Sequence, residues 1–156
     1  MPVEEIADSL ARLQVRDVED MAGVDGAPEG ARNLSGMLFC EPRNAIYVNA
    51  AEAWRSPGRR RFTLAHELGH WYLHATHQPG ERYERFCRGP DLENTRSKEG
   101  EANEFASALL MPEQLLGDIA KDLQINVPLL AKRFDVSVPA MRVRLLTSGL
   151  LPEWMR

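Results

Sequence analysis

The chain has 156 residues, of which 44% are hydrophobic and 27% are charged. This composition predicts one domain with a hydrophobic core, and it excludes a disordered chain or a disulfide-stapled peptide. No apolar run approaches the ~20 residues of a membrane helix, and the acidic N-terminus lacks a secretion signal. Cys40 and Cys87 form no CxxC pair. We therefore expect a cytoplasmic protein with no membrane partner and with ordinary thiols.

The net charge of −4 is unevenly distributed along the chain. Residues 1–36 carry eight acidic and three basic side chains, whereas residues 128–156 carry two acidic and five basic ones. An acidic total argues against a general nucleic-acid binder. The basic C-terminal segment, residues 128–156, is the part of the chain that could still bind nucleic acid.

Hydrophobic spacing predicts mostly helices and one small sheet. Residues 3–15 have apolar side chains three to four positions apart, as in an amphipathic helix, and a Gly-rich loop follows. Apolar runs at 37–40 and 45–49 predict two strands around a Pro-Asn turn. After a basic turn from Ser56, helices are predicted over 61–76, 98–110, 113–123, 127–134 and 138–149, with 77–98 mostly loop.

The predicted helix 61–76 contains an HExxH motif, His66-Glu67-Leu68-Gly69-His70. Residues four apart on a helix lie ~40° from each other, so His66 and His70 can bind one metal ion. Glu67 lies near the same face, where it can take a proton from a metal-bound water. Neutral imidazole suits zinc, and a catalytic zinc site has three protein ligands and one open position. The motif therefore predicts a zinc hydrolase with Glu67 as its general base.

Chance occurrence is the alternative to this interpretation, because HExxH also arises in purely structural helices. The helical wheel favours a metal site over a purely structural helix, because Leu64, Leu68 and Trp71 form a packing stripe on a different face from the two histidines. His74 lies ~12 Å along the axis from His66, too far to share its metal. We expect His74 to support the site from behind or to be a structural hydrogen-bonding residue.

The third ligand must come from another helix. The longer HExxHxxGxxH pattern is absent, because the chain has Leu73 and Thr76 at the diagnostic positions. In the predicted helix 98–110, Glu99 projects with the apolar stripe, whereas Glu101 points away. An inward carboxylate needs a partner, so Glu99 is the predicted ligand. Asn103 follows one turn later and can hold a ligand histidine through its outer nitrogen.

Together, RRRFTLAHELGHWYLH and EGEANEFASALLMP resemble the ImmA/IrrE-type metallopeptidase family over about residues 33–146. The resemblance implies zinc bound by His66, His70 and Glu99, with Glu67 as base. It also implies an α+β, gluzincin-like domain over 1–126, with a core at 33–112. Manganese remains a possible alternative metal, because affinity order does not fix the ion that a cell supplies.

The resemblance further implies a cytoplasmic endopeptidase that cleaves a protein substrate, namely a helix-turn-helix repressor of a mobile element or stress regulon. Such peptidases align the substrate on an edge strand, and Ile46, Tyr47 and Val48 are the candidates here, with core packing as the alternative. The oxyanion donor is left open among Tyr72, Tyr83, His74 and Arg85.

The C-terminal residues 127–156 are predicted to form a helix-turn-helix-like element packed on the same domain. Arg142 and Arg144 lie on its second helix, but they are few and share that helix with a packing stripe. Direct DNA binding is therefore not expected, whereas substrate docking or simple packing is. The alternatives to a peptidase are a non-cleaving, metal-stabilised binding module and a DNA-binding regulator that uses these helices.

Overall fold

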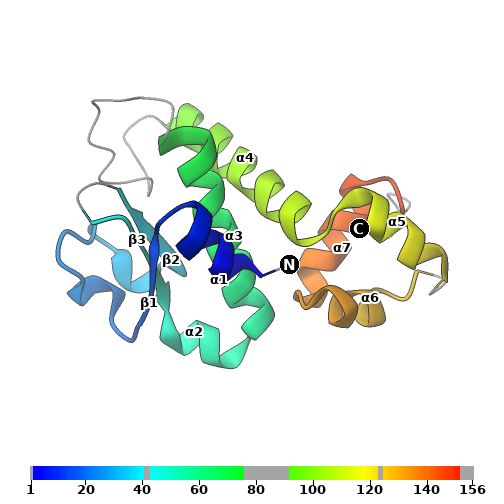
Figure 1. The fold of residues 1–156 in the computed structure, drawn as a ribbon, viewed down its shortest axis with the longest axis horizontal. Coiled ribbons are helices and arrows are strands. Elements are labelled where there is room, and N and C mark those ends of the chain that lie inside the picture. Colours follow the sequence, from blue (N-terminus) through cyan, green and yellow to red (C-terminus); the bar gives the residue numbers. More distant parts are fainter. Residues whose placement is uncertain (1, 41–42, 76–91, 123–124, 152–156) are drawn as a thin grey trace.

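The computed structural model describes residues 2–40, 43–75, 92–122 and 125–151. A small sheet lies beside two long helices, and shorter helices gather at the C-terminal end, which confirms the predicted α+β class (Figure 1). The helices are α1 Val3–Glu5, α2 Ala50–Arg55, α3 Pro57–His70, α4 Leu92–Leu110, α5 Glu113–Asp122, α6 Val127–Phe134 and α7 Val138–Thr147. The strands are β1 Gln14–Val18, β2 Gly36–Phe39 and β3 Ala45–Asn49. In the described part of the chain, no helix has the length and apolar character needed to cross a membrane.

The N-terminal segment differs from the helix predicted over 3–15. Helix α1 continues as a π-helical turn, Ile6–Leu10, and then ends, because Arg12 adopts a left-handed backbone with φ of 55°. Leu10, predicted to be on the apolar face, is 72% exposed, whereas Leu13 is buried after the helix has ended. The chain then forms strand β1, which the sequence analysis missed.

Strand β1 changes the position of β3 in the sheet. The strand order is β1-β3-β2, with β1 parallel to β3 and β2 antiparallel to it. Ile46, Tyr47 and Val48 therefore pair with strands on both sides, and all three are buried. The prediction that they form a substrate-binding edge is wrong, since their backbone already pairs within the sheet. Among the strands of the described residues, β2 occupies an edge instead.

Helix α3 begins at Pro57, within the segment predicted as a turn, because proline is tolerated in the first turn of a helix. It ends in a π-helical turn, Trp71–Ala75. Helix α4 packs closely along it, and a Cβ built on Gly69 would lie only 3.0 Å from the Ala102 Cα (Figure 1). Helix α4 also begins at Leu92, so the end of the predicted loop 77–98 is helical.

The C-terminal helices α5, α6 and α7 match the predicted segments closely, and Gly149, with φ of 67°, follows the last helix. The α6–α7 hairpin packs against the start of α3. The Arg61 guanidinium donates to the backbone carbonyls of Phe134 and Asp135 at 3.0 and 2.6 Å. A Cβ on Gly58 would lie 2.9 Å from the Val136 carbonyl carbon. Both hairpin helices contribute side chains to the core that contains Leu64 of α3.

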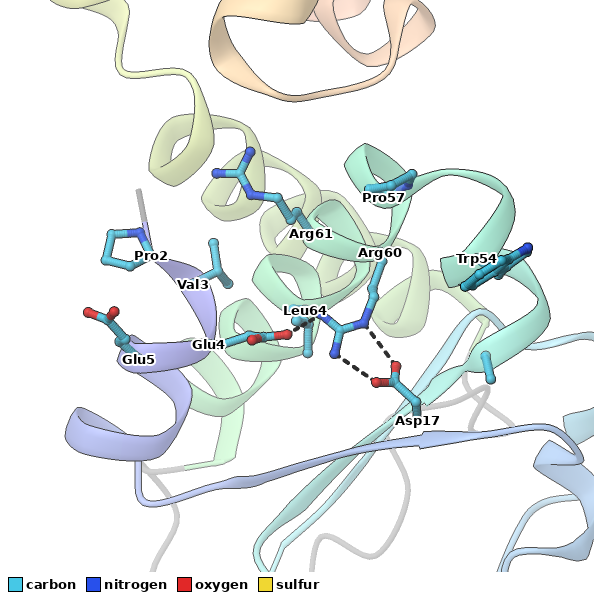
Figure 2. Close-up of a pocket in the computed structure, with 11 residues that line it drawn as sticks. Pro2, Val3, Glu4, Glu5, Asp17, Trp54, Pro57, Arg60, Arg61 and Leu64 are labelled. Atoms are coloured by element: carbon cyan, nitrogen blue, oxygen red, sulfur yellow. Dashed lines mark hydrogen bonds and ion pairs between the residues drawn. The ribbon is translucent and has the colours of Figure 1, made fainter.

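Arg60 of α3 ties the N-terminal segment to the sheet (Figure 2). Its Nε and Nη2 atoms donate to the two Asp17 oxygens at 2.9 Å each, and its Nη1 atom pairs with Glu4. The hydrogen bonds to Asp17 hold the pKa of Arg60 above its ordinary value, although burial opposes this. One guanidinium thus joins α1, β1 and α3.

Replacing Arg60 by methionine should lower the free energy of unfolding by about 1 kcal/mol, because a bidentate pair is lost from partly exposed positions. Urea unfolding of the metal-free protein measures this change. Arg55→Met is the matched control, since Arg55 is an exposed residue of the neighbouring helix α2. Equal destabilisation by the two changes would contradict the role assigned to Arg60.

Candidate metal centre

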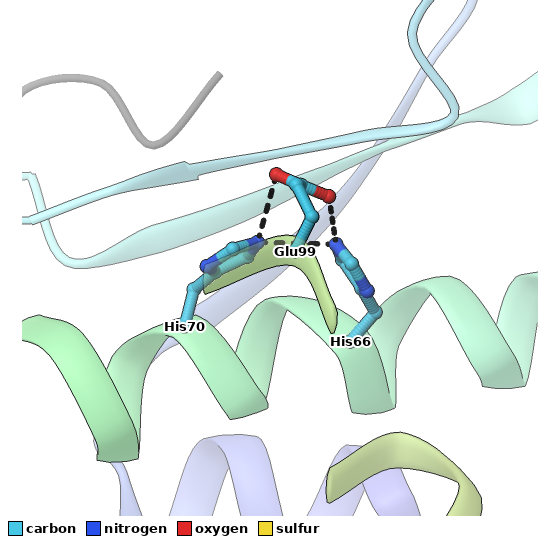
Figure 3. A group of neighbouring side chains, drawn as sticks. All are labelled: His66, His70 and Glu99. Carbon is cyan, nitrogen blue, oxygen red and sulfur yellow. Dashed lines mark hydrogen bonds and ion pairs between the residues drawn. The ribbon is translucent and has the colours of Figure 1, made fainter. Parts of the chain in front are cut away.

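Three side chains from two helices converge on one point (Figure 3). His66 and His70 come from α3, and Glu99 comes from α4, where the close approach at Gly69 brings the helices together. The Glu99 carboxylate oxygens lie 3.2 Å from His66 Nε2 and 3.3 Å from His70 Nε2. The two Nε2 atoms are 3.1 Å apart. The structure thus brings together the three residues predicted as metal ligands.

The spacing of these donor atoms suits a tetrahedral ion. Ligands bound ~2.1 Å from zinc at tetrahedral angles lie about 3.4 Å from one another. The 3.1 Å between the two Nε2 atoms is close to that value, each Nε2 atom lies 3.2–3.3 Å from a different Glu99 oxygen, and the three ligand atoms all lie within 4.8 Å of one another. Two imidazole nitrogens and one carboxylate oxygen also form a donor set that zinc accepts in catalytic sites. The residues therefore fit a zinc ion with one position left open.

Asn103 lies behind the first histidine. Its Oδ1 atom is 3.0 Å from His66 Nδ1, so an Nδ1–H group can donate to it and leave Nε2 as the ligand nitrogen. One turn of α4 separates Asn103 from Glu99, and the same helix therefore supplies both a ligand and the partner of another ligand. This is the arrangement that the sequence analysis expected for Asn103.

Charge is concentrated among the metal-binding side chains. Burial lowers the pKa of His66, but the hydrogen bond that its ring donates to Glu99 and the nearby carboxylates outweigh this effect, so the pKa is raised overall. For Glu99, burial acts to raise the pKa, yet the bonds with His66 and His70 dominate and lower it to about 2. Glu99 is thus held ionised, as a metal ligand must be.

Glu67 lies beside this cluster and is only 5% exposed. Burial raises the pKa of its carboxyl, while the neighbouring histidines oppose the shift. The start of β2 packs closely against Glu67. A Cβ built on Gly36 would lie 2.9 Å from Glu67 Oε1 and 2.5 Å from Thr63 Cγ2. A larger residue at this position would displace the side chains of Thr63 and Glu67. The sequence analysis assigned no role to Gly36, because nothing local in the sequence indicates this contact.

A cleft opens over these residues. It runs along α3 from Arg59 to His70, and residues 34–36 and Glu99 also line it. Glu67, His66 and Glu99 all line it. The arrangement places three candidate metal ligands and a buried carboxylate in one groove that also borders the start of β2.

The remaining predicted site residues lie away from the cleft lining. His74 is buried, and its Nε2 atom lies 3.3 Å from the Lys98 carbonyl oxygen and 3.9 Å from Glu101 Oε2. It therefore contacts the backbone next to Glu99 rather than the cleft. Tyr72 stacks against Phe105, with ring centroids 6.0 Å apart. The other oxyanion candidates, Tyr83 and Arg85, fall outside the described residues, as does Cys87.

Comparison with known proteins identifies the family. The model of the IrrE N-terminal-like domain matches residues 17–146. The chain belongs to this family. The radiation response metalloprotease IrrE of Deinococcus radiodurans is 34% identical to this IrrE-like chain over 137 residues. That match covers 82% of the chain and 39% of the relative.

A solved structure supports the fold of the IrrE-like domain. A Mycobacterium tuberculosis transcriptional regulator aligns with a TM-score of 0.66 at 19% identity, over 97% of this chain and 41% of that protein. At this identity the likeness concerns the fold alone. The IrrE-like chain thus spans about two fifths of the length of each of these relatives. Membership of a metalloprotease family supports a metal site and peptidase activity at the family level.

Proposed function

We propose that this IrrE-like chain is a zinc-dependent endopeptidase that cleaves a protein substrate. The observation that carries the proposal is the convergence of His66, His70 and Glu99, with Glu67 buried beside them in one cleft. A metal-stabilised binding module would need the three ligands but not an adjacent buried carboxylate. The presence of Glu67 therefore favours hydrolysis over binding alone.

Each residue has a separate task in this proposal. When bound, zinc would supply a Lewis acid that lowers the pKa of a coordinated water to about 7. Glu67 accepts a proton from the attacking water and donates it to the departing amine. Burial raises the pKa of Glu67, which makes its carboxylate a stronger base toward the attacking water. Asn103 keeps His66 oriented for binding.

The substrate is assigned to the edge strand β2 in place of the buried β3. Strand β2 pairs with β3 on one side, and its start at Gly36 lies against Glu67. An extended peptide added to the other side would pair through its main chain and pass over the metal-binding residues. Main-chain pairing of this kind holds many sequences in the same position.

The substrate that we propose is a helix-turn-helix repressor, and this part rests on the family resemblance. The name of the Deinococcus relative, a radiation response metalloprotease, is compatible with a stress regulon. A repressor substrate places the enzyme in the cytoplasm. The competing role as a DNA-binding regulator is less favoured, because the N-terminus of α7 packs against Gly58 instead of projecting outward as a recognition helix does.

Removing and restoring the metal tests this function. The chelated protein should leave a repressor encoded beside its gene intact, and adding zinc should restore cleavage at a defined bond. Mass spectrometry of the products locates that bond, and a parallel sample with manganese compares the two ions. If the zinc-loaded protein binds the repressor but leaves it intact after long incubation, the binding-module alternative is correct. Cleavage that persists in the chelated protein would reject metal-dependent hydrolysis.

A further inference from the structure

The cleft extends beyond the metal-binding residues to Arg59, which lies in the first turns of α3. Arg59 Nη2 donates to Ser35 Oγ at 3.3 Å, so the side chain reaches across to the wall that precedes β2. Its Nε atom lies 3.1 Å from Glu52 Oε2 of α2, and its side chain is 58% exposed. These contacts hold the guanidinium in place while leaving further N–H donors of its five for a ligand.

Arg59 gives this end of the cleft its charge. Among the described residues that line the cleft, the carboxylates are Glu67 and Glu99, and both belong to the metal centre. Arg59 is the one lysine or arginine in that lining. Its other neighbours there include Leu34 and Phe62, which carry no charge. Glu52 of α2 pairs with the Arg59 Nε atom from outside this lining, so an acidic side chain of a ligand would bind through the remaining guanidinium N–H donors.

The distance between Arg59 and His66 indicates which substrate residue Arg59 would contact. Seven residues of helix separate it from His66, or ~10 Å along the axis. A strand advances ~3.3 Å per residue, so an extended segment covers this distance in at most about three residues. Ser35, which the Arg59 side chain reaches, directly precedes Gly36, the first residue of β2 and the one beside Glu67, so the guanidinium lies closer to Glu67 than the helix spacing alone suggests. A substrate paired antiparallel to β2, the slightly stronger mode, therefore runs toward Arg59 after the cut.

Building on the proposed peptidase activity, we propose that Arg59 is a specificity-determining residue that selects Asp or Glu within about three residues after the scissile bond. The incoming carboxylate pairs with the guanidinium at the exposed end of the cleft. Because that end is open to water, the preference is graded rather than absolute.

A library of random synthetic decapeptides tests this selection. Zinc-loaded protein digests the library, and mass spectrometry counts the residues at each position after the cut. We expect Asp and Glu to be enriched about two- to fivefold at one of the first three positions, the range of a partly exposed ion pair. Arg59→Glu should replace this preference by one for Lys and Arg. The control Arg142→Glu changes the net charge equally on an exposed face of α7 and should keep the original preference.

Acidic enrichment that is absent from these positions, or that survives Arg59→Glu, overturns the inference. If no peptide is cut, the proposed function fails rather than the selection, and capture replaces cleavage as the readout. Zinc-loaded Glu67→Gln protein is then immobilised and exposed to the same library. Captured peptides should be rich in Asp and Glu, and the Glu67→Gln/Arg59→Glu double variant should lose that enrichment. Equal capture profiles for the two proteins would reject the role of Arg59.

Discussion

Replacing Glu67 by glutamine should abolish detectable cleavage while the protein still binds about one zinc ion per chain. Glutamine keeps the shape of the side chain but cannot accept a proton from the attacking water. Loss of general base catalysis costs about a hundredfold to ten-thousandfold in rate. Because Glu67 is nearly fully buried beside the three ligands without being one of them, the zinc content should not change. Product mass spectrometry and metal analysis measure the two quantities on the same sample.

The matched control is Glu104→Gln, on an exposed position of α4. This variant carries the same chemical change on the ligand helix and should cleave at the rate of the parent protein. A Glu67→Gln protein that still cleaves would remove Glu67 from the mechanism. One that has lost its zinc would instead assign Glu67 a structural role.

Replacing Glu99 by glutamine should weaken zinc binding by more than about a hundredfold, because loss of a ligand exceeds the tenfold to hundredfold cost of losing an outer partner. The same substitution at Glu101 should change the affinity by less than about threefold. Both glutamates lie on α4, but only Glu99 reaches the two histidine Nε2 atoms, whereas Glu101 accepts a hydrogen bond from Ser97 and lies 3.9 Å from His74. Competition with a fluorescent zinc chelator gives both affinities.

Comparable losses at Glu99 and Glu101 would contradict the assignment of one carboxylate to the metal. Circular dichroism of the metal-free variants separates this outcome from unfolding. The metal-free Glu99→Gln protein should remain folded, because the core around Leu64 and Ala106 does not involve this side chain.

The metal-binding residues could be placed together from sequence because helical periodicity is local. On a regular helix, four residues of spacing fix the relative direction of His66 and His70, and the same rule separates Glu99 from Glu101. The site also depends on contacts between separate elements, and helical periodicity does not predict these contacts. The fit of Gly36 against Glu67 depends on how far β2 lies from α3, and the reach of Arg59 to Ser35 depends on the same distance.

The errors in the fold have a similar origin. Apolar spacing from Val3 to Leu13 suggested one continuous helix, but Arg12 takes a left-handed backbone, and the apolar positions after it serve other elements. Strand β1 pairs in parallel with β3, about thirty residues away, so no local turn indicated it. Without β1, β3 was taken for an edge. One missed long-range pairing therefore moved the predicted substrate strand by one position in the sheet.

The absence of a side chain at Gly36 also bears on which parts of a target can be cut. The backbone of β2 lies directly against the base, so a paired peptide is positioned by its own N–H and C=O groups. Under the proposed function, only a segment whose backbone groups are free of internal hydrogen bonds can take that place. A tightly folded helix would resist the enzyme, whereas linkers and transiently unfolded regions would be cut. The local stability of the target, more than its sequence, would then set the rate at which it is destroyed.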